Sequence, residues 1–157
     1  MKNFWLKAVP VLVCLLISSG CSSAPPLGAM MVYITDLRPD ASGSSAELAL
    51  RYSNENVFPL AVQTTSGSLY LNNTYVGKFE HKVAVGLTQL GSASSKATLV
   101  VEKPAEFQAI VKATTTSPIA YRLASTLRLE IGEDKVTVKS ESTGQIDRAQ
   151  MIAEPAK

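Results

Sequence analysis

Apolar and polar residues alternate along most of this chain after residue 31, with the period of two that is typical of β-strands. Between residues 46 and 52 the even positions are apolar and the odd positions are polar or small. The same alternation runs through residues 126–131 and 135–139, and shorter runs at 32–34 and 97–101 share it. Because one face of each run is largely polar, the pattern favours antiparallel sheets with one side in water.

Turn signals separate these runs. Asn72 and Asn73 form a two-residue loop whose residues tolerate positive φ, and Gly132 begins a short link between the last two strands. Residues 104–113 differ, because their apolar side chains recur at helical spacing after Pro104. About seven strands and one short helix predict an all-β fold, an antiparallel β-sandwich of the immunoglobulin or fibronectin III type. We expect the helix to close one end of it.

The first twenty residues have the pattern of a removable signal peptide. Lys2 and Lys7 provide positive charge, and the apolar run 8–17 is too short to remain as a membrane span. Residues 17–21 read Ile-Ser-Ser-Gly-Cys, which resembles a bacterial lipobox. The resemblance implies cleavage before Cys21 and acyl chains on its thiol, which would form a stable membrane anchor. The alternative is an ordinary secretory signal in which Cys21 is incidental.

The lipobox resemblance also implies a location in the cell. In enterobacterial sorting the residue after the Cys matters, and Ser22 favours the outer membrane, facing the periplasm. The expected organisation is therefore a signal peptide at 1–20 and a lipidated, flexible tether at 21–30. One β domain follows at 31–146, and a C-terminal tail without strand periodicity occupies 147–157.

Charge and side-chain chemistry exclude several classes of function. The whole chain has 15 Lys and Arg against 13 Asp and Glu, but two of the lysines lie in the signal peptide. Without a basic excess, binding to nucleic acid is not expected. One histidine and no cysteine after residue 21 argue against a metal or another cofactor. No serine stands in a Gly-x-Ser-x-Gly motif, so we expect no catalytic residues, and we expect His81 to be exposed or partly packed.

A longer resemblance begins at the strand that ends in Tyr52. The segment Ser-Asn-Glu-Asn-Val-Phe-Pro-Leu follows it, and Leu-Tyr-Leu-Asn-Asn-Thr-Tyr-Val-Gly comes at 69–77. This order resembles the WHy (water stress and hypersensitive response) domain of the late embryogenesis abundant (LEA) type 2 family, over about residues 32–146. The family signature is Asn-Pro-Asn, then an apolar pair and Pro or a similar residue. Asn54, Asn56 and Pro59 match it, while Glu55 replaces the central Pro and leaves a softer turn.

Two roles are open for the asparagine pair. Asn54 and Asn56 can bond the backbone of their own turn, or their amides can bind something outside the chain. We expect the structural role. The family is folded, has no catalytic residues that could be transferred to this chain, and is linked to tolerance of desiccation, cold and other stress.

These observations lead to an expected function with two alternatives. The leading hypothesis is a non-enzymatic envelope lipoprotein that protects during water stress, with the membrane as partner through Cys21 and with client proteins or lipid as further partners. In the first alternative, the apolar residues 83–90 form a groove for a lipid or another hydrophobic ligand. In the second, an exposed strand edge pairs with an envelope partner during assembly.

Overall fold

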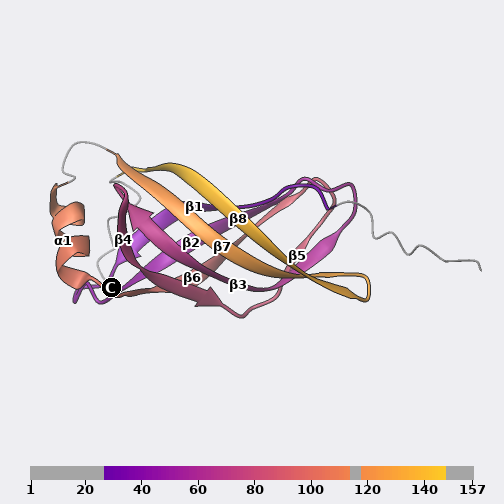
Figure 1. Cartoon of the computed structure of the whole chain (residues 1–157), viewed down its shortest axis with the longest axis horizontal. Helices are drawn as coiled ribbons and strands as arrows, with labels where there is room; N and C mark the ends of the chain where they lie inside the picture. The colour runs from indigo at the N-terminus through magenta and orange to yellow at the C-terminus, as the bar shows by residue number, and fades with distance from the viewer. Residues whose placement is uncertain (1–26, 114–117, 148–157) are drawn as a thin grey trace, which may run out of the picture.

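The computed structural model describes residues 27–113 and 118–147, which form an elongated all-β body with α1 at one end (Figure 1). In chain order its elements are β1 (Met30–Pro39), β2 (Ser45–Asn54), β3 (Leu60–Leu71), β4 (Thr74–His81), β5 (Val85–Leu87), β6 (Ser92–Val101), α1 (Pro104–Ala113), β7 (Ile119–Ile131) and β8 (Asp134–Ile146). The predicted helix at 104–113 is therefore confirmed, and it closes one end of the body as expected.

All eight described strands belong to one antiparallel sheet, in the order β1-β2-β6-β4-β3-β7-β8, with β5 paired to β3. β4 pairs with β6 over only four of its residues, Gly77 to Glu80, and the sheet bends at this short pairing. The bend brings β1 alongside β8, where the Ser142 hydroxyl donates to the Val32 carbonyl. The sheet is thus nearly barrel-shaped, closed at this seam through side chains.

This topology confirms an antiparallel all-β class with one short helix. It does not support the finer prediction of an immunoglobulin or fibronectin III sandwich, in which two sheets are bonded separately. The physical reason is β4, which pairs with β3 on one edge and with β6 on the other. No turn signal in the sequence reveals that one strand bridges both halves.

The core lies inside the bent sheet, and the alternation read from the sequence accounts for it. Leu48, Leu50 and Tyr52 on β2 are all fully buried, while the odd-numbered neighbours point outward or are half-buried. Every described strand contributes at least one buried apolar side chain, and α1 contributes Phe107. One continuous core on this scale is typical of a domain that folds as one unit.

Both predicted turns have the expected backbone. Asn72 and Asn73 have φ of 47° and 64°, and Gly132 has φ of 61°. Asparagine and glycine are the residues that reach this left-handed region at least cost. These turns set the registers of the β3–β4 and β7–β8 hairpins.

The body begins earlier than the predicted boundary at residue 31. Met30 is already buried in β1, and Leu27 packs against the core. The predicted signal peptide, Cys21 and residues 148–157 of the predicted tail lie outside the described residues. Among the residues described, no helix has the length and apolar character needed to cross a membrane.

Candidate functional site

Asn54, at the end of β2, is held by four hydrogen bonds inside the fold. Its side-chain amide donates to the carbonyls of Phe58 (2.9 Å) and Thr88 (2.8 Å). Its side-chain carbonyl accepts from the backbone N–H of Asn56 (3.0 Å) and from the side-chain amide of the same residue (2.8 Å). The side chain is 1% exposed. The amide thus joins the loop after β2 to the loop before β6.

Asn56 extends this connection to the start of the described chain. Its side-chain carbonyl accepts from the backbone N–H of Gly28, and its own backbone carbonyl accepts from Leu90 (2.9 Å). Next to it, the Glu55 N–H donates to the carbonyl of Ala29 (3.2 Å). We call Asn54 and Asn56 the asparagine latch. Both amides are engaged within the chain and buried, so they are not presented to an outside ligand.

The arrangement of Pro59 and of the apolar segment 83–90 differs from that of a ligand groove. Pro59 is exposed and directly precedes β3. Within the predicted groove segment 83–90, Val85 and Leu87 are buried in the core, whereas Val83 and Leu90 are exposed. A shallow depression of about 470 Å³ adjoins β5 and the start of β3. Leu87 borders this depression, but Val85 and Leu87 both point into the core and leave no deep apolar groove along the segment.

His81 is buried, at 5% exposed, and lies deeper than the sequence predicts. It occupies the last position of β4, where the register places it opposite Thr65 with the ring turned inward. Its Nε2 lies 2.7 Å from the Ser95 hydroxyl, and its ring centroid is 6.5 Å from that of Tyr52. Burial lowers the pKa of His81, because the charged form loses hydration there. The imidazole is therefore neutral at pH 7.

A serine beside a histidine can act as a nucleophile with its base, so this pair needs a geometric test. A base of this kind is normally oriented by a third group at its other ring nitrogen. Within the described part of the chain, Nδ1 of His81 has no hydrogen-bond partner. The Ser95–His81 contact joins a half-buried serine to a buried histidine, without an orienting group. Sequence reasoning missed Ser95, because only the folding of β4 next to β6 brings the two residues together.

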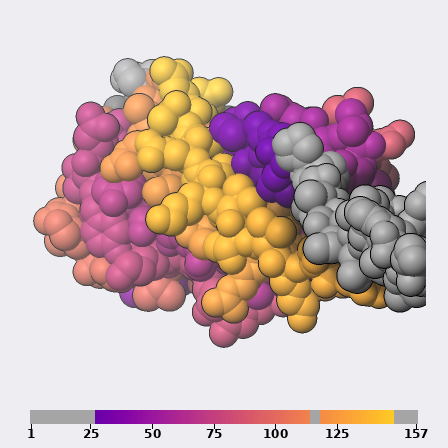
Figure 2. Space-filling model, turned by 45° about the vertical axis from the view of Figure 1, so that its right-hand side comes forward, coloured from indigo at the N-terminus to yellow at the C-terminus, as the bar shows by residue number. Residues whose placement is uncertain are grey.

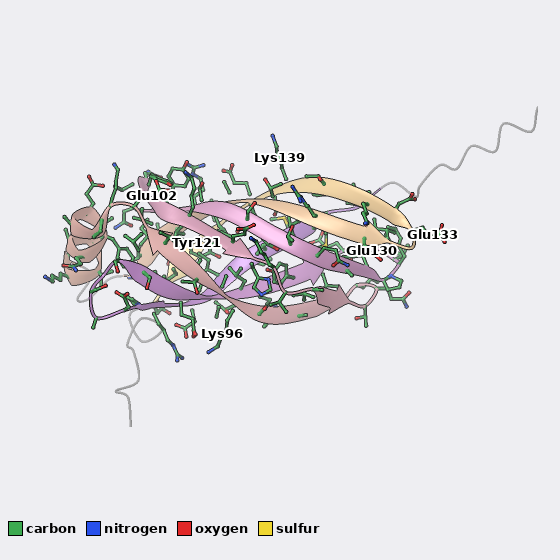
Figure 3. All side chains as sticks on the ribbon, turned by 90° about the horizontal axis from the view of Figure 1, so that it is seen from below. Lys96, Glu102, Tyr121, Glu130, Glu133 and Lys139 are labelled. Carbon is green, nitrogen blue, oxygen red and sulfur yellow. The ribbon has the colours of Figure 1, made fainter. Side chains whose placement is uncertain are left out.

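The outer face of β3, β7 and β8 has a depression of about 550 Å³. Small outward side chains form its floor, namely Ser66, Ser68, Ala124 and Thr126. Lys139 borders it on β8, and Figure 3 shows this side chain pointing away from the ribbon. Hydroxyls and an ammonium group at one surface can bind polar or anionic groups through hydrogen bonds.

On β4, the opposite border of this depression is electrically neutralised. Lys78 forms an ion pair with Glu102 at 3.2 Å. The neighbouring Tyr75 hydroxyl and then the Lys78 ammonium hold the pKa of Glu102 below its usual range. The positive character of the face is therefore concentrated toward β7 and β8. The residues at positions 66, 124 and 139 that line this depression are distant in sequence. No sequence pattern predicts that they lie close together.

The fold and the latch define an all-β domain with a nearly closed barrel and a fully bonded asparagine turn. No family model matches the chain, and no curated protein matches it. Among solved structures, the Arabidopsis thaliana protein AT1g01470 is similar with a TM-score of 0.52 and 16% identity, over 79% of this chain and 87% of that one.

Two further solved structures resemble the chain less closely in geometry. A protein from Archaeoglobus fulgidus has a TM-score of 0.45 and 17% identity, with 77% of this chain and 96% of that one covered. A candidate late embryogenesis abundant protein, At2g46140.1, has a TM-score of 0.43 and 15% identity, with 76% and 71% covered. At such identities, what the AT1g01470 likeness shows is the fold.

Proposed function

We propose that this chain is a WHy, LEA type 2 domain of an envelope lipoprotein, which protects neighbouring proteins or membrane during water stress without catalysis. The observation that carries the proposal is the asparagine latch. Asn54 and Asn56 occupy the positions of the family's asparagine signature, and four hydrogen bonds of Asn54 give that signature a structural reason in this fold. The fold likeness to AT1g01470 supports the proposal at the level of architecture.

The proposed anchor is an acylated Cys21, in the outer membrane and facing the periplasm. The described body begins at Leu27, which packs against the core, and at Gly28, whose N–H donates to the Asn56 side chain. Six residues, 21–26, separate the anchor from the described body, and they reach about 20 Å when extended. Metabolic labelling with a fatty-acid analogue tests the anchor: label should enter the native chain and not Cys21→Ser. Equal labelling of both would overturn it.

The character of the outer surface supports the proposed protective role. Exposed hydroxyls stand on β6 at Ser92, Ser94 and Thr98, and on the outer face of β3 and β8 at Ser66 and Thr137. Neutral hydroxyls exchange hydrogen bonds with water at little net cost, so they allow many weak contacts and few strong ones. Such contacts would separate partly unfolded neighbours as water is removed, without trapping them.

The experiment for the protective role dries or freezes a labile enzyme with residues 22–157 of this chain. Equal masses of albumin and of an unrelated β-sandwich are the controls. We expect more recovered enzyme activity with this chain than with either control. Recovery no better than the controls would overturn the protective function.

The hydrophobic-carrier alternative is not favoured by the site. Such a carrier needs an apolar pocket, usually of several hundred Å³, with few polar groups. Here Val85 and Leu87, from the segment that suggested the groove, are core residues. The alternative would return if delipidated protein took up a fatty acid at a defined ratio.

A further inference from the structure

Three cations gather on the outer face of the last hairpin, where Arg128 of β7 lies diagonally between Lys135 and Lys139 of β8. The register places Arg128 opposite Thr137, so each lysine is two residues from the directly paired position. Diagonal neighbours of this kind stand about 7–8 Å apart, within reach of long side chains. All three side chains are exposed. We call them the hairpin triad.

The three residues of the triad form no ion pair among the described residues, unlike four lysines elsewhere in the body; Arg51 and Lys112 also form none. Lys78, Lys82, Lys96 and Lys103 each lie within 3.2 Å of a carboxylate oxygen. In the described part of the chain, no carboxylate lies within salt-bridge distance of Arg128, Lys135 or Lys139. The triad therefore keeps its positive charge available at the surface, although the chain beyond the signal peptide is neutral overall.

The two acids on the same face are held by other groups. Glu130 accepts a hydrogen bond from the Gln63 side-chain amide at 2.8 Å, and Glu141 lies 3.8 Å from Arg122. Glu130 also stands directly opposite Lys135 in the β7–β8 register and offsets part of the charge of that lysine. With Arg122, the outer face of the β7–β8 hairpin carries four cations against these two carboxylates, and this net positive charge can attract an anion from outside the protein.

The described chain begins beside this face. Residues 27–31 and residues 137–141 line a common groove of about 490 Å³ between the start of β1 and β8. In Figure 2, β8 in yellow and β1 in indigo lie next to each other on one surface. With the anchor at Cys21 that is proposed above, the six residues between it and the described body would keep the β8 side within about 20 Å of the lipid.

We propose that the hairpin triad binds the phosphate groups of an anionic lipid surface and so orients the body on the membrane. The anchor position comes from the proposed function, but the binding itself does not require acylation. Arg128 supplies a planar guanidinium that can hold two phosphate oxygens, and the lysines act as point charges beside it. Small hydroxyl residues around the triad let a headgroup approach the sheet.

The test uses residues 22–157, which lack Cys21 and keep every buried residue of the described body. Binding is measured by co-sedimentation with vesicles of phosphatidylcholine, with and without about one third phosphatidylglycerol, at low salt. We expect binding only to the anionic vesicles. The triple variant R128Q/K135Q/K139Q should bind about 100-fold more weakly, at about fivefold for each cation near an anionic surface.

The matched control removes the same charges elsewhere, as R51Q/K96Q/K112Q. These three exposed residues lie on β2, β6 and α1, and Figure 3 shows Lys96 on the opposite side of the ribbon from Lys139. The control should bind like the native chain. The charge-preserving variant Arg128→Lys should bind between the native chain and the triple variant, because lysine keeps the charge but not the planar guanidinium. Equal losses in the two triple variants, or equal binding to neutral vesicles, would overturn the proposal.

This outcome is separate from that of the proposed function. Loss of vesicle binding leaves labelling at Cys21 and enzyme protection unchanged. Failure of labelling or of protection leaves vesicle binding unchanged.

Discussion

Removing the Asn54 side chain should cost a large part of the stability of the domain. Asn54→Ala deletes four hydrogen bonds, two to backbone carbonyls and two from Asn56. Each bond contributes about 1 kcal/mol net, and the partners left behind are buried, so the expected loss is about 4 kcal/mol. A domain of this size has a free energy of unfolding of only about 5–15 kcal/mol.

A second substitution at the same position tests the reasoning more sharply. Asn54→Asp preserves the shape, but an acceptor oxygen then replaces the amide nitrogen that faces the carbonyls of Phe58 and Thr88. A carboxylate against two carbonyls is repulsive, so the loss at pH 7 should equal or exceed that of Asn54→Ala. The control is Ser53→Ala, next in the chain and half-buried, which should stay within about 0.5 kcal/mol.

The assay is urea unfolding of residues 22–157 followed by circular dichroism. The midpoint should move and the slope should not, because the surface exposed on unfolding hardly changes. A loss below about 1 kcal/mol for Asn54→Ala would refute the structural role of the latch, because it would be no more than one ordinary hydrogen bond. Tolerance of Asn54→Asp would refute it as well, by showing that no donor is needed there.

Three further predictions concern other parts of the body. Because the pKa of His81 is lowered in the fold, the unfolded chain binds the proton more readily, so stability should fall as pH drops below the ordinary value of 6.5. His81→Gln should flatten that fall in urea titrations, and an unchanged slope would contradict the assignment. Gly77→Ala would place a Cβ 2.1 Å from a β6 carbonyl oxygen and should cost about 3 kcal/mol or more, whereas Gly86→Ala meets nothing within 4 Å and should be tolerated in the same titration. Glu55→Pro restores the family's Pro but removes an N–H that bonds residue 29, so stability should change by less than about 1 kcal/mol while limited proteolysis at 27–29 speeds up. Unaltered protection of that segment would argue against this bond.

The middle of β3 shows why some parts of the strands cannot be predicted from the sequence. Residues 63–68 read Gln-Thr-Thr-Ser-Gly-Ser and have no apolar alternation, yet they form the centre of a twelve-residue strand. The segment is paired on both edges, to β4 and to β7. Backbone hydrogen bonds stabilise a strand whatever its side chains are, and partners this far away in sequence leave no local trace. For the same reason the depression over Ser66 and Ser68 had no sequence signal.

The candidate site also has some features that the sequence predicts and others that only the structure shows. The pair Asn54 and Asn56 was identified as a turn from its own residues, because asparagine side chains bond nearby backbone. Only the structure reveals three hydrogen-bond partners of the latch, namely Gly28, Thr88 and Leu90. The meeting of Ser95 with His81 depended on the bend between β4 and β6 in the same way.

The sequence by itself determined the all-β class, the helix at 104–113, the two hairpin turns and the faces of the strands that carry the core. These features follow from short-range rules: a period of two or 3.6, and residues that tolerate a left-handed backbone. The tertiary structure decided the closure of one sheet into a near-barrel and the burial of His81. It also decided the clustering of Arg128, Lys135 and Lys139 beside the start of the body. Those features depend on which distant strands pair, and pairing is selected by the packing of the whole core.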